Sequence, residues 1–374
     1  MQAGNKDCIS GGSVFGVRVE SRFHPVFPLS NRACEDTMIF KTLKFEISGS
    51  CNAKCPYCST GNKSNPKIGE KSKMVTLEEF TSTMNHLEKI ELIKPGITVI
   101  YPYNWGEPLL NANVVDILNY IGDKGYSYCL STNASFVPAS IEYLRNLPDI
   151  LVVSMPGFSQ KSYGKIHGFK FETILKNIET LRKFSKKMSI SFHIYQFNLD
   201  EIRMAKNYFT FKRNVNFGMY YAVFCDFNQA KRYLKDEMSY CELKNSSKDL
   251  ILGYVKDRID NRPSDYSCEE FERLVIDEHG NYITCCTLGR NDECYKYGKV
   301  GELSKDEVVY LKKKQAVCEE CLALGMSYWW HNWEHPKIFS QTNRYLRGTL
   351  SVVNLARQKT TKLMNFLLAG RPYE

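Results

Sequence analysis

Cys51-Asn52-Ala53-Lys54-Cys55-Pro56-Tyr57-Cys58 places three thiols within eight residues, in a C-x-x-x-C-x-x-C spacing. Residues 43–47 before it alternate as a strand does, so the cysteines fall on the loop that leaves a strand. Three thiolates can hold three irons of an iron–sulfur cube and leave the fourth iron open to a small chelating molecule. Zinc is the alternative, but it needs a fourth Cys or His nearby, and none lies between Cys58 and Met74.

The composition is that of an ordinary soluble globular protein, with 43% hydrophobic and 24% charged residues. The 374 residues suffice for one large domain and a smaller one. The sequence has no apolar run of about 18 residues and no signal-peptide pattern at 1–16, so no transmembrane helix or export is expected. The 14 cysteines cluster at 51–58 and 268–321, which is typical of metal sites and indicates a cytoplasmic protein.

The net charge of +9 is concentrated at the end of the chain. Residues 335–374 hold seven Lys or Arg against one acid, a net of +6. A solvated helix face explains this charge, and contact with an anionic membrane surface is the sharper alternative. No nucleic-acid partner is expected.

From residue 42 the pattern alternates between strands and amphipathic helices. Strands are predicted at 42–48, 96–103, 126–131, 149–154, 188–195 and 215–224, and helices at 76–91, 113–124, 138–147, 170–187 and 200–209. Thr76 and Glu79 predict a capping box at the start of the first helix. Residues 226–267 are expected to be mostly helical, and residues 345–368 to form a helix. Six strands that alternate with helices predict an α/β fold with a parallel sheet, curled into a partial (β/α)6 TIM-like barrel. The site of such a fold lies at the carboxyl ends of the strands, where the cysteine loop begins.

Polar residues follow several of these strands. Residues 104–108, Asn-Trp-Gly-Glu-Pro, follow the second strand, and a glutamate there can accept hydrogen bonds from an ammonium group. Ser131 and Asn133 end the third strand, Ser154 ends the fourth, and Asn198 follows the fifth. By residue type alone, turns and helix caps explain these positions equally well.

A second group of cysteines follows the barrel pattern. Cys268, Gly280 and Cys285 are spaced C-x11-G-x4-C, and residues 274–276 and 282–284 flank Gly280 like a hairpin. Cys318 and Cys321 form a later C-x-x-C pair. These four cysteines can close a metal site, and by chemistry alone zinc is a fair competitor.

The first cysteine motif, with Tyr57 before its last cysteine, resembles that of the radical S-adenosylmethionine (SAM) enzymes. Residues 106–108 resemble the Gly-Gly-Glu-Pro motif of the same family, except that Trp105 replaces its first glycine. The resemblance implies a 4Fe–4S cluster on Cys51, Cys55 and Cys58. It implies further that S-adenosyl-L-methionine contacts Tyr57, Gly106, Glu107, Pro108, Ser131, Asn133, Ser154 and Asn198.

The second cysteine group resembles the auxiliary-cluster domain of the same superfamily, in the shorter "twitch" form. The longer "SPASM" form has a further cysteine where this chain has Ser327. The resemblance therefore implies one auxiliary 4Fe–4S cluster, on Cys268, Cys285, Cys318 and Cys321. Cys286 and Cys294 are spare and can replace a misassigned ligand.

The resemblance covers roughly residues 42–325 and implies four parts. These are an N-terminal extension (1–41), a radical SAM partial barrel (42–226), a twitch/SPASM-like auxiliary domain (227–330) and a basic helical tail (331–374). Two further features remain open. Cys225 is either a core thiol or a hydrogen donor, and the aromatic run 328–333 either packs between domains or walls a substrate pocket.

The implied chemistry is reductive cleavage of S-adenosylmethionine to a 5′-deoxyadenosyl radical, which takes hydrogen from a substrate carbon. With the auxiliary cluster accepting a second electron, the expected reaction is oxidation of a small polar, sugar-like molecule. A flavodoxin or ferredoxin is the expected reductant. A maturase that cross-links or epimerises a ribosomal peptide or protein is the alternative, and a non-enzymatic electron carrier is the third possibility.

Overall fold

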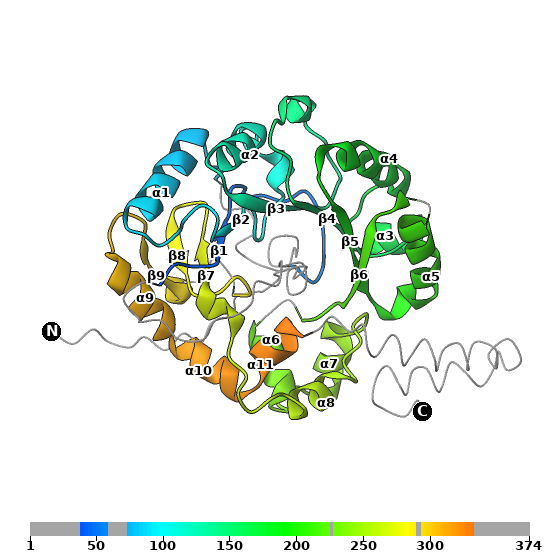
Figure 1. Ribbon diagram of the computed structural model, residues 1–374. Helices are drawn as coiled ribbons and strands as arrows, with labels where there is room; N and C mark the ends of the chain where they lie inside the picture. The colour runs from blue at the N-terminus through cyan, green and yellow to red at the C-terminus, as the bar shows by residue number, and fades with distance from the viewer. Residues whose placement is uncertain (1–37, 59–72, 212, 225–226, 289–292, 333–374) are drawn as a thin grey trace, which may run out of the picture.

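The computed structural model describes residues 38–58, 73–211, 213–224, 227–288 and 293–332. Nine strands of this described part form one sheet in the order β6-β5-β4-β3-β2-β1-β7-β8-β9. Strands β1 to β6 pair in parallel, and the sheet curls into the arc of Figure 1. This confirms the predicted partial barrel. The strands are β1 (Thr42–Phe45), β2 (Val99–Tyr101), β3 (Ser127–Thr132), β4 (Ile150–Met155), β5 (Met188–Ile194), β6 (Asn216–Tyr221), β7 (Arg273–Ile276), β8 (Asn281–Ile283) and β9 (Lys296–Lys299).

Side-chain alternation gives the arc an apolar outer face. Outward residues such as Phe45 join the main core with the helices, and the Phe45 ring stacks on Phe80 at 5.1 Å. On β5, the alternate side chains that point to the opposite face of the sheet include Ser189, Ser191 and His193, and these are also buried. Helices cover the outer face in Figure 1: α1 (Leu77–Lys89), α2 (Val114–Asp123), α3 (Gln160–Ile166), α4 (Phe171–Leu181) and α5 (Ile202–Lys206).

Local signals in the sequence set several of these boundaries. Thr76 and Glu79 form the predicted capping box at the start of α1, with the Glu79 N–H 3.2 Å from the Thr76 hydroxyl. Gly125 follows α2 with a φ of +79°, a conformation that glycine adopts without strain. The predicted strands all occur, most of them shorter than expected.

Two helix predictions need correction, and one helix was missed. Residues 138–147 form only a 3₁₀ turn (Ala139–Tyr143), because the Asn119 side-chain carbonyl accepts the Arg145 N–H at 2.7 Å that a longer helix would use. Residues 200–209 are divided among a 3₁₀ turn, α5 and a π-helix (Asn207–Phe211). Helix α3 was not predicted; Ser159 caps it through the Ser162 N–H.

The second half of the chain extends the same sheet. Gly280 sits in the turn of the β7–β8 hairpin with a φ of +81°, as predicted. The sequence did not predict that β7 pairs in parallel with β1, which makes the hairpin a continuation of the barrel sheet. The expected helical stretch after β6 is present. The remaining helices are α6 (Phe227–Leu234), α7 (Tyr240–Ser246), α8 (Val255–Asp260), α9 (Lys305–Lys313), α10 (Ala316–Ala323) and α11 (Met326–His331).

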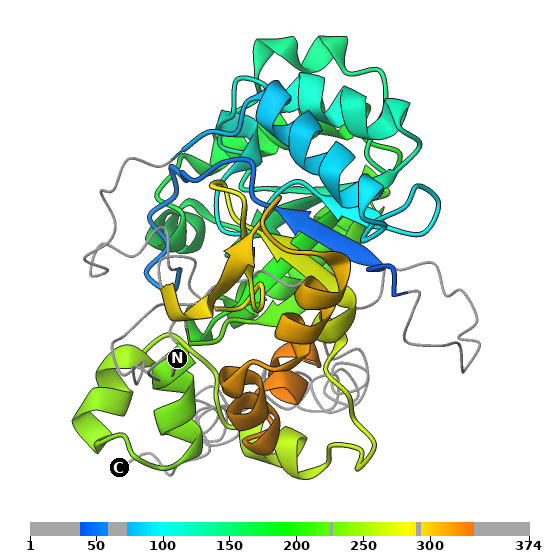
Figure 2. The same cartoon turned by 90° about the vertical axis from the view of Figure 1, so that its left-hand side faces the viewer.

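The C-terminal helices close the open side of the arc. In Figure 1 they lie opposite β3, and in Figure 2 the orange helices lie at the other end of the molecule from α1 and α2. No helix of the described residues is long and apolar enough to span a membrane. The predicted helix at 345–368 and Cys225 lie outside the described residues.

Candidate functional site

The first three cysteines lie together on the loop after β1. All three are half-buried, and the Cys58 N–H lies 3.3 Å from the Cys55 carbonyl. Burial, then the Glu107 carboxylate and the Cys58 thiol, raise the pKa of Cys51. Burial and the other two thiols raise the pKa of Cys55. The thiols are therefore close enough to oppose one another's ionisation, and a bound cationic centre would relieve that repulsion.

The loop after β2 packs directly on this cysteine loop. A Cβ on Gly106 would lie 1.6 Å from the Ser48 carbonyl oxygen, so only glycine fits there. The Glu107 N–H donates to the Ser50 carbonyl at 2.8 Å, one residue before Cys51. The predicted cofactor loop and the predicted cluster loop are thus one assembly.

A buried carboxylate on the first loop holds the second, and the sequence analysis missed it. Glu46 accepts the N–H groups of Asn104, Trp105 and Gly106 at 3.2, 2.5 and 2.8 Å through one oxygen. Its other oxygen accepts the Ser48 N–H at 3.2 Å. A lone glutamate at an inward strand position, next to a cysteine motif, was the signal available.

Trp105 stands where the family motif has a glycine, and the structure explains the difference. Its side chain is 3% exposed and packs with Val275, Ile283 and Cys286 of the hairpin region. The neighbouring Asn104 amide lies 3.5 Å from the Cys286 carbonyl. The loop after β2 therefore contacts both cysteine groups at once.

Glu107 ties the end of β2 to the end of β3. Its carboxylate accepts the Thr132 hydroxyl and the Asn133 N–H, each at 2.7 Å, and the Leu109 N–H at 3.1 Å. Burial raises its pKa to about 7, although these hydrogen bonds act in the opposite direction. Three bonds leave acceptor capacity on the two oxygens for a ligand. Pro108 begins the short 3₁₀ turn that follows.

The other predicted contact residues lie at neighbouring strand ends. The Asn133 amide lies 3.7 Å from the Cys51 sulfur, so β3 touches the cysteine loop. Ser131 and Ser154 are buried. The Asn198 side chain already bonds three main-chain groups, those of Pro156, His193 and Tyr195, at 2.7 to 2.9 Å. Its contact with a cofactor stays a prediction.

Tyr57 connects the cysteine loop to the C-terminal part of the chain. Its hydroxyl donates to Asp249 at 3.1 Å, and Asp249 also pairs with Lys165 of α3 at 2.5 Å. The Tyr57 ring lies 5.9 Å from that of Tyr195. These contacts fix the aromatic residue that precedes Cys58.

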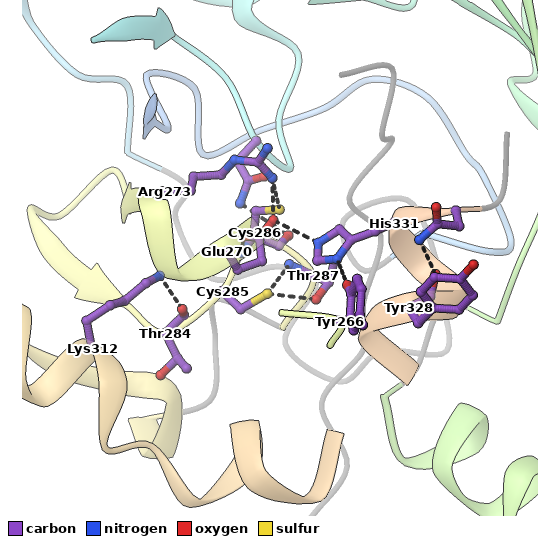
Figure 3. A network of polar contacts seen from close by, with 12 residues as sticks. Tyr266, Glu270, Arg273, Thr284, Cys285, Cys286, Thr287, Lys312, Tyr328 and His331 are labelled. Carbon is purple, nitrogen blue, oxygen red and sulfur yellow. Dashed lines mark hydrogen bonds and ion pairs between the residues drawn. The ribbon is translucent and has the colours of Figure 1, made fainter. Parts of the chain in front are cut away.

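The four cysteines predicted for the second site line one pocket, between the hairpin and α9–α11. Beside Cys268, Cys285, Cys318 and Cys321, it is lined by Ser327, Lys312, Glu270 and His331 among others. Figure 3 shows the polar network there, in which Arg273 pairs with Glu270 and lies 3.7 Å from the Cys286 sulfur.

The spare cysteines differ in their surroundings. Cys286 is buried, and a hydrogen bond with the Cys285 thiol lowers its pKa. Ligand atoms of Glu270, Cys285 and Cys286 lie within 4.8 Å of one another, so Cys286 could act as a substitute ligand. Cys294 is exposed.

The aromatic run serves mainly as packing. Trp329 is fully buried and Trp330 is 6% exposed, in a second core that includes Phe227 and Leu252. Trp330 also lines the pocket of the four cysteines. The packing role considered from the sequence is thus present in this run, whereas walling of a substrate pocket stays a prediction.

Residues 45–208 match the model of the Radical SAM superfamily, so this part of the chain is a radical SAM domain. No curated protein matches the sequence. Among solved structures, the chain resembles Streptococcus suis SuiB bound to precursor peptide SuiA, with a TM-score of 0.52, 15% identity and coverage of 77% of this chain and 71% of that one. It resembles native anSMEcpe with bound AdoMet at a TM-score of 0.50 and 16% identity, over 77% of this chain and 88% of that one.

At these identities the likeness is one of fold. In another crystal structure of Streptococcus suis SuiB, the match spans 63% of that chain, less than two thirds. An iron–sulfur cluster and S-adenosylmethionine are the cofactors of the Radical SAM superfamily, and the site fits both. Three half-buried thiols share one loop, and the Gly106 contact leaves no room for a side chain between that loop and its neighbour.

Proposed function

We propose that the protein is a radical SAM oxidoreductase that oxidises a small polar molecule with the help of an auxiliary 4Fe–4S cluster. One observation carries the proposal: the loop of residues 104–107 contacts both cysteine groups, through Gly106 on one side and Trp105 on the other. An electron carrier has no need of such a loop. When bound, the first cluster and S-adenosylmethionine supply the 5′-deoxyadenosyl radical that takes a hydrogen atom from the substrate.

In this proposal Cys51, Cys55 and Cys58 hold the first cluster. Glu107 and the strand ends at Ser131, Asn133 and Ser154 orient S-adenosylmethionine, together with Tyr57, Gly106, Pro108 and Asn198. The main-chain bonds of Glu46 and Glu107 support this assignment, because they fix the loop before any ligand arrives. A preorganised loop loses little conformational freedom on binding.

Cys268, Cys285, Cys318 and Cys321 would hold the auxiliary cluster, which would supply an acceptor for the second electron. Their placement around one pocket supports this assignment. The pocket also carries the buried Lys312, whose charge suits an anionic thiolate centre.

The inward face of the barrel favours a polar substrate. The Ser189 and Ser191 hydroxyls and the His193 Nε2 are buried, and the described residues offer none of them a hydrogen-bond partner. Buried polar atoms need partners, so a ligand rich in hydroxyl groups, or ordered water, suits this face. Burial lowers the pKa of His193 to about 4, so the imidazole is neutral at pH 7 and can donate or accept a hydrogen bond.

The decisive experiment is anaerobic turnover with deuterated candidates. Reconstituted protein, S-adenosylmethionine and a flavodoxin or ferredoxin system are incubated with perdeuterated polyols or sugars. The proposal predicts deuterium in 5′-deoxyadenosine and, with unlabelled substrate, a product two mass units lighter than that substrate. Failure to bind S-adenosylmethionine by calorimetry would exclude both enzymatic candidates, the oxidoreductase and the maturase, and favour the electron carrier.

A peptide maturase is the second candidate. The similarity in fold to SuiB bound to precursor peptide SuiA is the observation that favours it. Deuterium transfer from a perdeuterated peptide, with none from any sugar, would decide for the maturase. In either case we propose a reducing, cytoplasmic setting; membrane contact by the basic tail stays a prediction, since residues 333–374 lie outside the described part.

A further inference from the structure

The pocket of the four cysteines contains a buried ammonium group. Lys312, on the last turn of α9, is 1% exposed. Its Nζ donates to the Thr284 carbonyl at 2.5 Å, one residue before Cys285, as Figure 3 shows. Within the described residues, no carboxylate forms an ion pair with it. Burying an unpaired cation costs desolvation free energy, and an anion bound in the pocket would offset that cost.

Among the described residues that line the pocket, the other ionisable side chains besides the cysteines, Glu270 and His331, already have partners. Arg273 and Glu270 form a buried ion pair, and His331 lies 3.5 Å from the same carboxylate. The acidic residue Glu320 of α10 is engaged elsewhere, since it pairs with Lys231 of α6 and with Lys235 just beyond that helix. Among the described residues that line this pocket, Lys312 is therefore the charged side chain that is available to stabilise an anionic occupant.

We propose that Lys312 sets the reduction potential of the auxiliary cluster, by holding a fixed positive charge at the carbonyl next to its ligand Cys285. This inference rests on the proposed auxiliary cluster. Adding an electron to a thiolate-ligated cluster makes it more negative, and a nearby cation stabilises that state. Lys312 is a positioning charge and does not itself ligate iron. Its effect is to make the cluster a better electron acceptor during substrate oxidation.

The test uses the full chain with Cys51→Ala, Cys55→Ala and Cys58→Ala, so that only the second site can hold iron. This parent should carry about four irons per chain and a single EPR-active couple. Lys312→Met keeps the apolar stem and removes the charge. We expect its midpoint potential to fall, so that at the parent's midpoint the reduced-to-oxidised ratio drops about tenfold, which is about 59 mV for one electron.

Two controls separate charge from structure. Lys312→Arg keeps the charge and should stay near the parent potential. Lys313→Met removes an exposed lysine from the adjacent position of α9 and should change nothing. The iron-free Lys312→Met protein should melt no lower than the iron-free parent, because it no longer buries an unpaired ammonium. If Lys312→Met retains no iron while Lys312→Arg does, the positive charge is needed for binding of the cluster as well as for its potential, which supports the proposal.

The failures are distinguishable. An unchanged midpoint in Lys312→Met, with four irons bound, overturns the role of Lys312 and leaves the auxiliary cluster intact. A parent that binds one zinc and no iron overturns the auxiliary cluster and this inference with it. Turnover of S-adenosylmethionine by wild-type protein is unaffected by either outcome, so the radical SAM assignment stands apart.

Discussion

The two cysteine sites are assembled in different ways. The first takes its three thiols from one loop after β1, while the second collects four from the start of a 3₁₀ turn, the hairpin and α10. Their charged neighbours differ as well. The first site faces the buried carboxylate of Glu107, which adds to burial in raising the pKa of Cys51, whereas the second faces the ammonium of Lys312 and the Glu270 carboxylate that pairs with Arg273. The first is thus built by local sequence and the second by tertiary packing.

The largest expected effect is loss of the local site. Changing Cys51, Cys55 or Cys58 to Ala removes one ligand of a three-thiolate cluster and should abolish reductive cleavage of S-adenosylmethionine. Assays of 5′-deoxyadenosine with dithionite measure this directly. Cys294→Ala, at an exposed cysteine outside both sites, is the matched control. Full activity in any of the three variants would falsify the ligand assignment.

The second expected effect tests whether the sites are independent. A Cys268→Ala/Cys285→Ala protein should fall from about eight irons per chain to about four, yet still cleave S-adenosylmethionine when given a strong reductant. It should not complete substrate oxidation, because the second electron has no acceptor. Iron analysis and product analysis on one preparation check both points. Wild-type protein with about four irons and one zinc would contradict an oxidative role for the second site.

The sequence predicted the local site better than the site made by packing. Strand alternation, the capping box at Thr76 and the turn at Gly280 depend on near neighbours, and the structure has all three. The parallel pairing of β7 with β1 joins residues about 230 positions apart, and periodicity within a strand carries no information on its partner. The roles of Glu46 and Lys312 were missed for the same reason. Glu46 bonds the loop after β2, Lys312 bonds the Thr284 carbonyl, and both contacts join segments that are apart in the sequence.

The third expected effect concerns the residue that joins the two sites. Trp105→Ala leaves a cavity against Val275, Ile283 and Cys286 and should cost about 3–5 kcal/mol of unfolding free energy. The backbone N–H of residue 105 still reaches Glu46, so affinity for S-adenosylmethionine should change less than stability. Denaturant unfolding of the iron-free protein and calorimetry of the loaded protein measure the two quantities. A large loss of affinity with little loss of stability would show that Trp105 acts on the cofactor rather than on the hairpin.

The smallest expected effect is on the carboxylate that shapes the loop. Glu46 accepts four main-chain N–H groups, three of them from residues 104–106, while an amide in its place offers one acceptor and turns two donors toward them. Glu46→Gln should therefore relax the loop and weaken binding of S-adenosylmethionine about tenfold, or about 1.4 kcal/mol, close to the lower limit for the loss of a hydrogen bond to a charged group.

The matched control is Glu79→Gln, which alters another carboxylate that accepts a main-chain N–H, far along the chain in the capping box of α1. That variant should lose a little stability and no affinity. If Glu46→Gln binds S-adenosylmethionine as tightly as wild type, the Gly106 contact and the Glu107–Ser50 hydrogen bond suffice to hold the loop. The EPR spectrum of the auxiliary cluster adds a second readout. Because Asn104 and Trp105 also touch the region of Cys286, a spectrum perturbed in Glu46→Gln and unchanged in Glu79→Gln would mean that the two sites are coupled through this loop.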